Sequence, residues 1–209
     1  MEYRCVTTSI EGFVQQLAVA YITHGYWFYV AGEIPEGKEL AAIDAKLIER
    51  YGIAITKWAR CRRKKQGLAN MQYLRHERFF LLLATKGRHE FFEREMASFR
   101  DVRRAPIKFA GYSIGCRKGS DGRWHASVRI SRENHASLKA AFVEIGLRRT
   151  LAVATREFSR VQFQCFAPVR RQILEALGAV NRARGAAGLE LVPLASVSLR
   201  RAIVQPFQD

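Results

Sequence analysis

The stretch IKFAGYSIGCRKGSDGRWHASVRIS, residues 107–131, decides the fold of this chain. Two runs with β-strand character are joined there by a Gly-Ser-Asp-Gly turn signal, which predicts a β-hairpin. Apolar and polar residues alternate in the second run, and successive side chains of a strand point to opposite faces. One face therefore carries Trp124, Ala126, Val128 and Ile130, and the other carries His125, Ser127 and Arg129.

The register of the hairpin decides whether the apolar residues of both strands share one face. They do so if Lys118 lies opposite Trp124, which requires a loop with an odd number of residues. A two-residue Asp121-Gly122 turn would mix the faces, so we predict the odd loop. Gly115 would then lie on the polar face and leave room for another backbone, such as a nucleic-acid strand; a solvated hairpin face is the alternative.

Composition and charge narrow the classes of protein to which this chain can belong. Its 209 residues are 48% hydrophobic, which is enough for a core and argues against global disorder. The net charge of +16 favours an anionic polymer or surface as partner. The excess is uneven, because residues 1–50 hold 4 Lys/Arg and 7 Asp/Glu whereas residues 51–209 hold 31 and 12. We expect the acidic segment to face away from a polyanion.

Cysteine spacing and hydropathy indicate the cellular compartment in which the protein is expected. Cys5, Cys61, Cys116 and Cys165 lie far apart without a CxxC pair, which predicts free thiols and no zinc site. No run of about 20 apolar residues is present, and the first residues do not form a signal peptide. We expect no membrane partner and a cytoplasmic location.

Hydrophobic spacing predicts an alternation of helices and strands. A capping box at Thr8 and Glu11 precedes the first helix. Helices are expected over 10–21, 38–51, 55–67, 131–145 and 168–184, with short ones from Thr150 and within 86–101. The C-terminal tail has a short amphipathic piece around 199–203. Strands are expected over 26–34, 71–74 and 79–85, in addition to the hairpin. The run FFLLLAT at 79–85 is apolar on both faces and belongs in the interior of a sheet.

These elements predict one compact α+β domain over residues 1–209. It would contain a central, mainly antiparallel sheet with helices packed on it and a helical C-terminal region. Its parts are an acidic helix-strand-helix unit over 1–52, a basic sheet core over 53–146 and a basic helical region over 147–209.

The segment KWARCRRKK, residues 57–65, is the densest run of cations, with Trp58 and Ile55 expected to anchor it. Neutralised phosphates release counterions, so such a run supplies affinity without sequence choice; a solvated surface helix is the alternative. The residues expected to contact nucleic acid are Lys57, Arg60, Arg62, Arg63, Lys64, Lys65, Arg88, Arg103, Arg104, Lys108, Arg117, Lys118, Arg123, Arg129, Arg170 and Arg171.

An apolar strand (FFLLLAT), a hairpin whose return strand contains WHAS, and then helices follow one another here. This order resembles the rolling-circle replication initiators, relaxases and small transposases of the His-hydrophobe-His nuclease class. The resemblance implies two histidines, two apart on one strand face, that bind a divalent metal, and a later helix tyrosine that attacks DNA. His125 matches the first histidine, but Ser127 replaces the second, Phe166 replaces the tyrosine, and Tyr112 is the last tyrosine of the chain.

Other catalytic arrangements are conceivable from the residue types. His125, Ser127 and Arg129 are the candidate catalytic residues of a metal-free RNA-cleaving site, with imidazole as general acid or base and arginine stabilising the phosphorane charge. Glu90, Glu93 and Asp101 would converge with His89 or His125 if a nuclease used Mg²⁺ or Mn²⁺. No metal ligand set and no resident cofactor is predicted otherwise.

Three functions follow as hypotheses. The first is a non-catalytic nucleic-acid-binding protein that grips a phosphate backbone, of DNA or RNA, with a basic sheet face and helices. The second is a diverged DNA or RNA endonuclease that uses His125. The third is a subunit of a mobile-element, replication or ribonucleoprotein complex, in which the acidic N-terminal unit contacts a protein.

Overall fold

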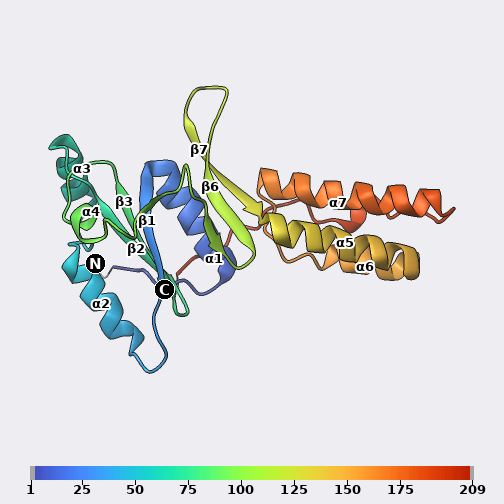
Figure 1. The fold of residues 1–209 in the computed structure, drawn as a ribbon, viewed down its shortest axis with the longest axis horizontal. Coiled ribbons are helices and arrows are strands. Elements are labelled where there is room, and N and C mark those ends of the chain that lie inside the picture. The colour runs from blue at the N-terminus through green and yellow to red at the C-terminus, as the bar shows by residue number, and fades with distance from the viewer. Residues whose placement is uncertain (1–2, 208–209) are drawn as a thin grey trace. The chain divides into compact units, whose positions relative to one another are not determined.

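The structure is a computed structural model, and it describes residues 3–207. Its contacts divide the chain into two compact units. Unit 1 comprises the described parts of Met1–Ile107, Ile114–Ser127 and Val204–Asp209, and unit 2 comprises Lys108–Ser113 and Val128–Ile203. Antiparallel sheets, helices and a helical C-terminal region confirm the predicted α+β class (Figure 1). The expected single domain stays a prediction, and sequence spacing did not indicate the two units.

Unit 1 contains a four-stranded sheet in the order β2-β3-β1-β4. The strands are β1 (Tyr26–Glu33), β2 (Met71–His76), β3 (Phe79–Thr85) and β4 (Arg100–Asp101). All neighbouring pairs are antiparallel. The interior position expected for the apolar run 79–85 is confirmed, because β3 pairs with a strand on each side.

Both faces of this sheet are covered by apolar side chains. On one face, Phe91 and Tyr51 belong to a buried cluster with strand residues, supplied by α4 (Phe91–Arg94) and by the residue that ends α2 (Leu40–Arg50). On the other face, Phe13 of α1 (Ile10–Gln15) packs edge-on against Phe79 at 5.8 Å. A strand covered on both faces needs apolar residues at every position, which explains FFLLLAT.

The N-cap of the first helix lies one residue after the predicted one. Ser9, not Thr8, is the N-cap, and its hydroxyl oxygen accepts a hydrogen bond from the Gly12 amide at 3.0 Å. The helix continues as a π-helical turn (Gln16–Tyr21) and a 3-10 turn (Ile22–His24) before Gly25, whose φ of 91° ends it as predicted.

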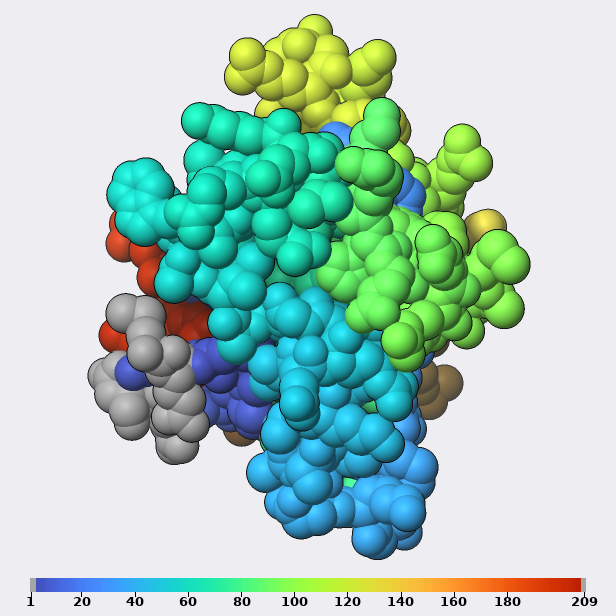
Figure 2. All heavy atoms as spheres, turned by 90° about the vertical axis from the view of Figure 1, so that its left-hand side faces the viewer, coloured from blue at the N-terminus to red at the C-terminus, as the bar shows by residue number. Residues whose placement is uncertain are grey.

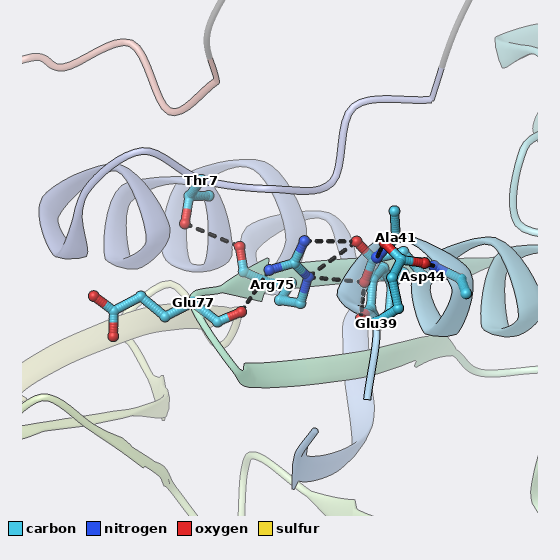
Figure 3. A network of polar contacts seen from close by, with 8 residues as sticks. Thr7, Glu39, Ala41, Asp44, Arg75 and Glu77 are labelled. Carbon is cyan, nitrogen blue, oxygen red and sulfur yellow. Dashed lines mark hydrogen bonds and ion pairs between the residues drawn. The ribbon is translucent and has the colours of Figure 1, made fainter. Parts of the chain in front are cut away.

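A buried ion pair joins α2 to the sheet, and periodicity did not predict it. Asp44 is the buried residue of α2, and Arg75 of β2 donates to both of its carboxylate oxygens at 2.7–3.0 Å (Figure 3). The Tyr73 hydroxyl donates to the same carboxylate at 2.6 Å. Burial raises the pKa of Tyr73, and the bond to Asp44 raises it further. The carboxylate therefore has all of its charge balanced inside the unit.

The hairpin has the odd loop that the apolar pattern required. Strands β5 (Ile107–Phe109), β6 (Tyr112–Lys118) and β7 (Trp124–Ile130) form a second sheet in that order. The Gly119 amide donates to the Arg123 carbonyl at 2.8 Å, which leaves three residues in the loop and a positive φ at Gly122.

The expected open polar face of the hairpin is not available to a ligand at Gly115. This glycine is buried, and a β-carbon placed on it would lie 3.4 Å from both the Val102 carbonyl oxygen and the Pro106 side chain. The space that a glycine leaves is therefore filled by the protein's own chain, not by another polymer.

Unit 2 is built mainly from α5 (Arg132–Arg148), α6 (Leu151–Ser159), α7 (Ala167–Ala186) and a 3-10 turn (Leu194–Ser196). Ser131 and Thr150 cap the first two helices as expected. Phe142 and Phe158 stack at 4.3 Å in the core. The short amphipathic piece noted around 199–203 has a backbone without regular structure.

Gly146, predicted to end a helix, lies inside α5 instead. A β-carbon on it would lie 2.6 Å from Cγ1 of Val180 on α7, so the glycine permits close helix packing. Arg184 of α7, expected on the polar side of its helix, is buried and donates to the carbonyls of Gly146 and Glu190. Local sequence does not distinguish a glycine that allows a neighbouring helix to pack closely from a glycine that terminates its own helix.

Gly146→Ala is therefore expected to destabilise the protein by about 1–3 kcal/mol, because the stiff Val180 side chain has to move. Gly178→Ala is the matched control, since a β-carbon there meets only the flexible end of Arg182 at 3.5 Å. That control is expected to gain roughly 0.4–1 kcal/mol from helix propensity and a stiffer unfolded chain. Urea unfolding of the two variants checks this, and equal midpoints would contradict the packing role of Gly146.

Candidate nucleic-acid interface

The predicted basic helix is present as α3, which spans Lys57–Lys65. The Thr56 hydroxyl caps it by accepting a hydrogen bond from the Ala59 amide at 3.2 Å. Six of its nine residues are cationic. The exposed cations, which form no ion pair with any residue of 3–207, are Lys57, Arg62, Lys64 and Lys65.

Two other cations of α3 are used to hold the helix in place. Arg63 donates through Nε and Nη2 to the Ala69 carbonyl at 3.2 and 3.1 Å. Arg60 is half-buried and directs Nη2 to the Ile53 carbonyl at 3.5 Å. Their guanidinium groups are thus engaged with backbone oxygens, so the geometry does not support the phosphate contacts predicted for them.

Arg88 lies beside the end of α3. The backbone of Leu68 forms a parallel bridge with Arg88, and the Ala69 amide donates to the Arg88 carbonyl at 3.0 Å. The Arg88 side chain is exposed. Figure 2 shows α3 in cyan to teal on this face, next to the green segment that contains α4. We call the set Lys57, Arg62, Lys64, Lys65 and Arg88 the α3 surface.

An open basin of about 750 Å³ adjoins the α3 surface but has a mixed charge. Arg63 and Arg88 line it together with Glu49, Glu90 and Glu93. His89 also lines it, and its Nδ1 accepts a hydrogen bond from the Phe91 amide at 3.1 Å. Burial lowers the pKa of His89, and nearby Arg63 lowers it further. The carboxylates make the basin a poorer phosphate site than the helix beside it.

Arg103 is held by a carboxylate and by aromatic rings. Its Nε and Nη2 donate to Asp101 at 2.9 and 2.6 Å. Its Cζ lies 4.3 Å from the centroid of the Trp27 ring and 5.6 Å from that of Trp124. Burial tends to raise the pKa of Asp101, but the bonds from Arg103 outweigh this effect and hold the pKa below its ordinary value. Arg103 therefore acts inside unit 1, and its predicted phosphate contact is not supported.

Two residues that were expected to anchor their segments, Trp58 and Met96, are exposed instead. Trp124, placed by alternation on the apolar face of its strand, is 37% exposed and lies against Arg103. Trp58, expected to anchor α3, is 75% exposed. Met96, expected to anchor the segment before β4, is also exposed.

The hairpin loop carries the second group of exposed cations in unit 1. Arg117 and Lys118 end β6, and Arg123 precedes β7. Asp121 in this loop lies 2.9 Å from Nε2 of His125, and this contact lowers the pKa of Asp121. Arg104 is exposed as well. The exposed cations of unit 1 that the structure brings together therefore lie on a helix and on a loop.

The three candidate catalytic residues do not form an open site. The ring of His125 is exposed and held by Asp121, whereas Ser127 is 8% exposed and its hydroxyl is buried without a hydrogen-bond partner among the described residues. Arg129 is half-buried. A phosphate cannot reach the Ser127 hydroxyl, so this geometry does not favour cleavage by the set.

Two of the three carboxylates considered for a metal site are paired with arginines. Glu90 bonds to Arg94 at 3.0 Å, and Asp101 bonds to Arg103. Within residues 3–207, no group of three or more His, Cys, Asp or Glu side chains lies close enough to hold a metal ion. The same part of the chain has no helix that is long and apolar enough to cross a membrane.

Unit 2 carries a separate set of predicted contacts. Arg170 and Arg171 are exposed near the start of α7, whereas Lys108 pairs with Glu133 at 3.4 Å. Phe166, at the position where the resemblance implies a tyrosine, is the N-cap of α7, and Arg201 lies over its ring at 4.9 Å. Unit 2 holds 14 Lys/Arg and 5 Asp/Glu, a net charge of +9, so the cationic excess is present in both units.

Comparison with protein-family models, with curated proteins and with solved structures finds no match for this chain. The resemblance to the His-hydrophobe-His nucleases stays a prediction.

Proposed function

We propose that this protein binds nucleic acid and that the α3 surface and the hairpin loop of unit 1 hold the phosphate backbone. The observation that carries the proposal is the α3 surface itself. Four exposed cations that form no ion pair with the described part of the chain lie on one nine-residue helix, and Arg88 lies beside its end. Cations this close repel one another unless counterions or a polyanion neutralise them.

The chemistry of a polyanion fits these positions better than that of an acidic protein. Lys64 and Lys65 are consecutive, and Arg62 lies less than one helical turn before Lys65. The positive charges are therefore closely spaced along the helix, as phosphates are along a nucleic-acid strand. Backbone contacts of this kind position a polymer without reading its bases. The proposal therefore includes no base preference and no choice between DNA and RNA.

Catalysis is not part of the proposal, because the Ser127 hydroxyl is buried and His125 is held by Asp121. The acidic residues 1–52 fit a different role. Like charges repel a phosphate backbone, so we expect this segment to stay free for a protein subunit of a replication, mobile-element or ribonucleoprotein complex.

Fluorescence anisotropy with labelled oligonucleotides tests the proposal. Purified protein, freed of co-purified nucleic acid, is titrated into DNA and RNA of about 20 nucleotides at about 50 mM salt, where a dissociation constant of roughly 1 μM or lower is expected. A second preparation, from which co-purified nucleic acid has not been removed, is digested with RNase or DNase to identify any nucleic acid that it carries. Absence of binding to every oligonucleotide would refute the proposal.

A further inference from the structure

Trp58 is the exposed aromatic residue that the fold does not use. It is 75% exposed, and among residues 3–207 its indole makes no hydrogen bond, aromatic ring contact or cation–π contact. Large aromatic side chains dominate the energetics of cores and interfaces, so a tryptophan left in water on a folded unit points to a ligand. By contrast Trp27, another of the three tryptophans, donates its Nε1 proton to the Ile22 carbonyl at 3.2 Å.

The position of Trp58 on α3 places it among the free cations. Trp58, Arg62 and Lys65 follow at i, i+4 and i+7, the spacing of residues that share one face of a helix. Lys57 precedes it in the first turn. A strand whose phosphates contact these cations would therefore pass directly over the indole.

An indole among phosphate-binding cations meets a base only where that base is unpaired. In a duplex the bases are stacked inside the helix, whereas in a single strand they turn outward and stack on aromatic rings. We infer that Trp58 is a stacking residue for an unpaired base and that it makes the α3 surface prefer single-stranded to double-stranded nucleic acid. This inference rests on the proposed function and names the class of ligand for the same site.

Other occupants fit the surface less well. A second copy of the chain would bring two helices with six cations in nine residues against each other. An anionic membrane offers phosphates, but helices that lie in a membrane interface bury a broad apolar face. On α3 only Trp58, Ala59 and Cys61 are not cationic, so such a face is missing.

Anisotropy titrations of four proteins test the inference: wild type, Trp58→Ala, Trp58→Phe and Met96→Ala. Met96→Ala is the matched control, because Met96 is 76% exposed in the same unit and lies outside the α3 surface. We expect Trp58→Ala to weaken single-strand binding about 10-fold or more and duplex binding less than about twofold. Trp58→Phe should retain most of the affinity, and Met96→Ala should behave as wild type.

Tryptophan fluorescence supplies a second readout that a structural role would not change. Stacking of a base on the indole should quench the emission of the wild-type protein, and most of this quenching should be lost in Trp58→Phe, which keeps Trp27 and the partly exposed Trp124. Unchanged quenching in Trp58→Phe would overturn the inference.

The outcomes separate the inference from the proposed function. If wild type and Trp58→Ala bind single strands equally, or if the variant loses single-strand and duplex binding to the same extent, the stacking role is wrong while nucleic-acid binding stands. If no oligonucleotide binds, the proposed function fails with it. Binding to phosphatidylglycerol vesicles but not to oligonucleotides would overturn both.

Discussion

Arg75→Met is expected to destabilise the protein by roughly 3–5 kcal/mol, because it leaves the Asp44 carboxylate buried without its counter-charge. Both residues are 6% exposed, and the guanidinium supplies three hydrogen bonds to that carboxylate. Burial tends to lower the pKa of Arg75, but the bonds to Asp44 outweigh this effect and raise it, so the guanidinium keeps its charge. Urea unfolding measures the loss.

The double variant Asp44→Leu/Arg75→Met is the matched control. It removes both charges, so it should be more stable than Arg75→Met, with a remaining loss of about 1–3 kcal/mol because the buried Tyr73 hydroxyl loses its acceptor. A single variant within about 1 kcal/mol of wild type would show that the ion pair does not hold α2 to the sheet.

Reversing two charges on α3 is expected to have the largest effect on function. Lys64→Glu/Lys65→Glu should weaken oligonucleotide binding about 100-fold at low salt, because it removes two phosphate contacts and adds repulsion. Both lysines are exposed, so the fold should tolerate the change.

Lys38→Glu/Lys46→Glu is the control for net charge. It alters the charge of the chain by the same amount, and both lysines are exposed in the acidic segment. We expect it to change the affinity for the oligonucleotide less than about threefold, because it changes only the net charge of the protein. Equal losses for the two double variants would mean that the protein attracts a polyanion only through its net charge and has no interface on α3.

Local sequence patterns predicted the regular elements of the fold well. The continuous apolar run of β3 and the odd hairpin loop are both observed, because burial on two faces and the period of two act within a few residues. Gly146 and Asp44 were assigned wrongly or overlooked. Their roles depend on Val180 and Arg75, which are distant in sequence and leave no local signal.

Some features of the candidate site were likewise predictable from the sequence, and others were not. The charge of Lys64 and Lys65 and the helix that carries them were evident from the sequence, and both residues are exposed. The engagement of Arg63 with the Ala69 carbonyl and of Arg103 with Asp101 was not evident, because a run of cations looks the same whether a guanidinium faces solvent or a backbone oxygen. The exposure of Trp58 was also missed, since an aromatic residue in a helix more often packs inward.

The salt dependence of binding tests the central claim most directly. Association constants for one single-stranded oligonucleotide are measured between about 50 and 200 mM salt, and the logarithm is plotted against that of the salt concentration. Contacts from the α3 surface and the hairpin loop predict a slope of about −3 or steeper, and Lys64→Glu/Lys65→Glu should make it shallower by more than ~1. A slope near zero, or one that the double variant leaves unchanged, would contradict a phosphate backbone held by these cations.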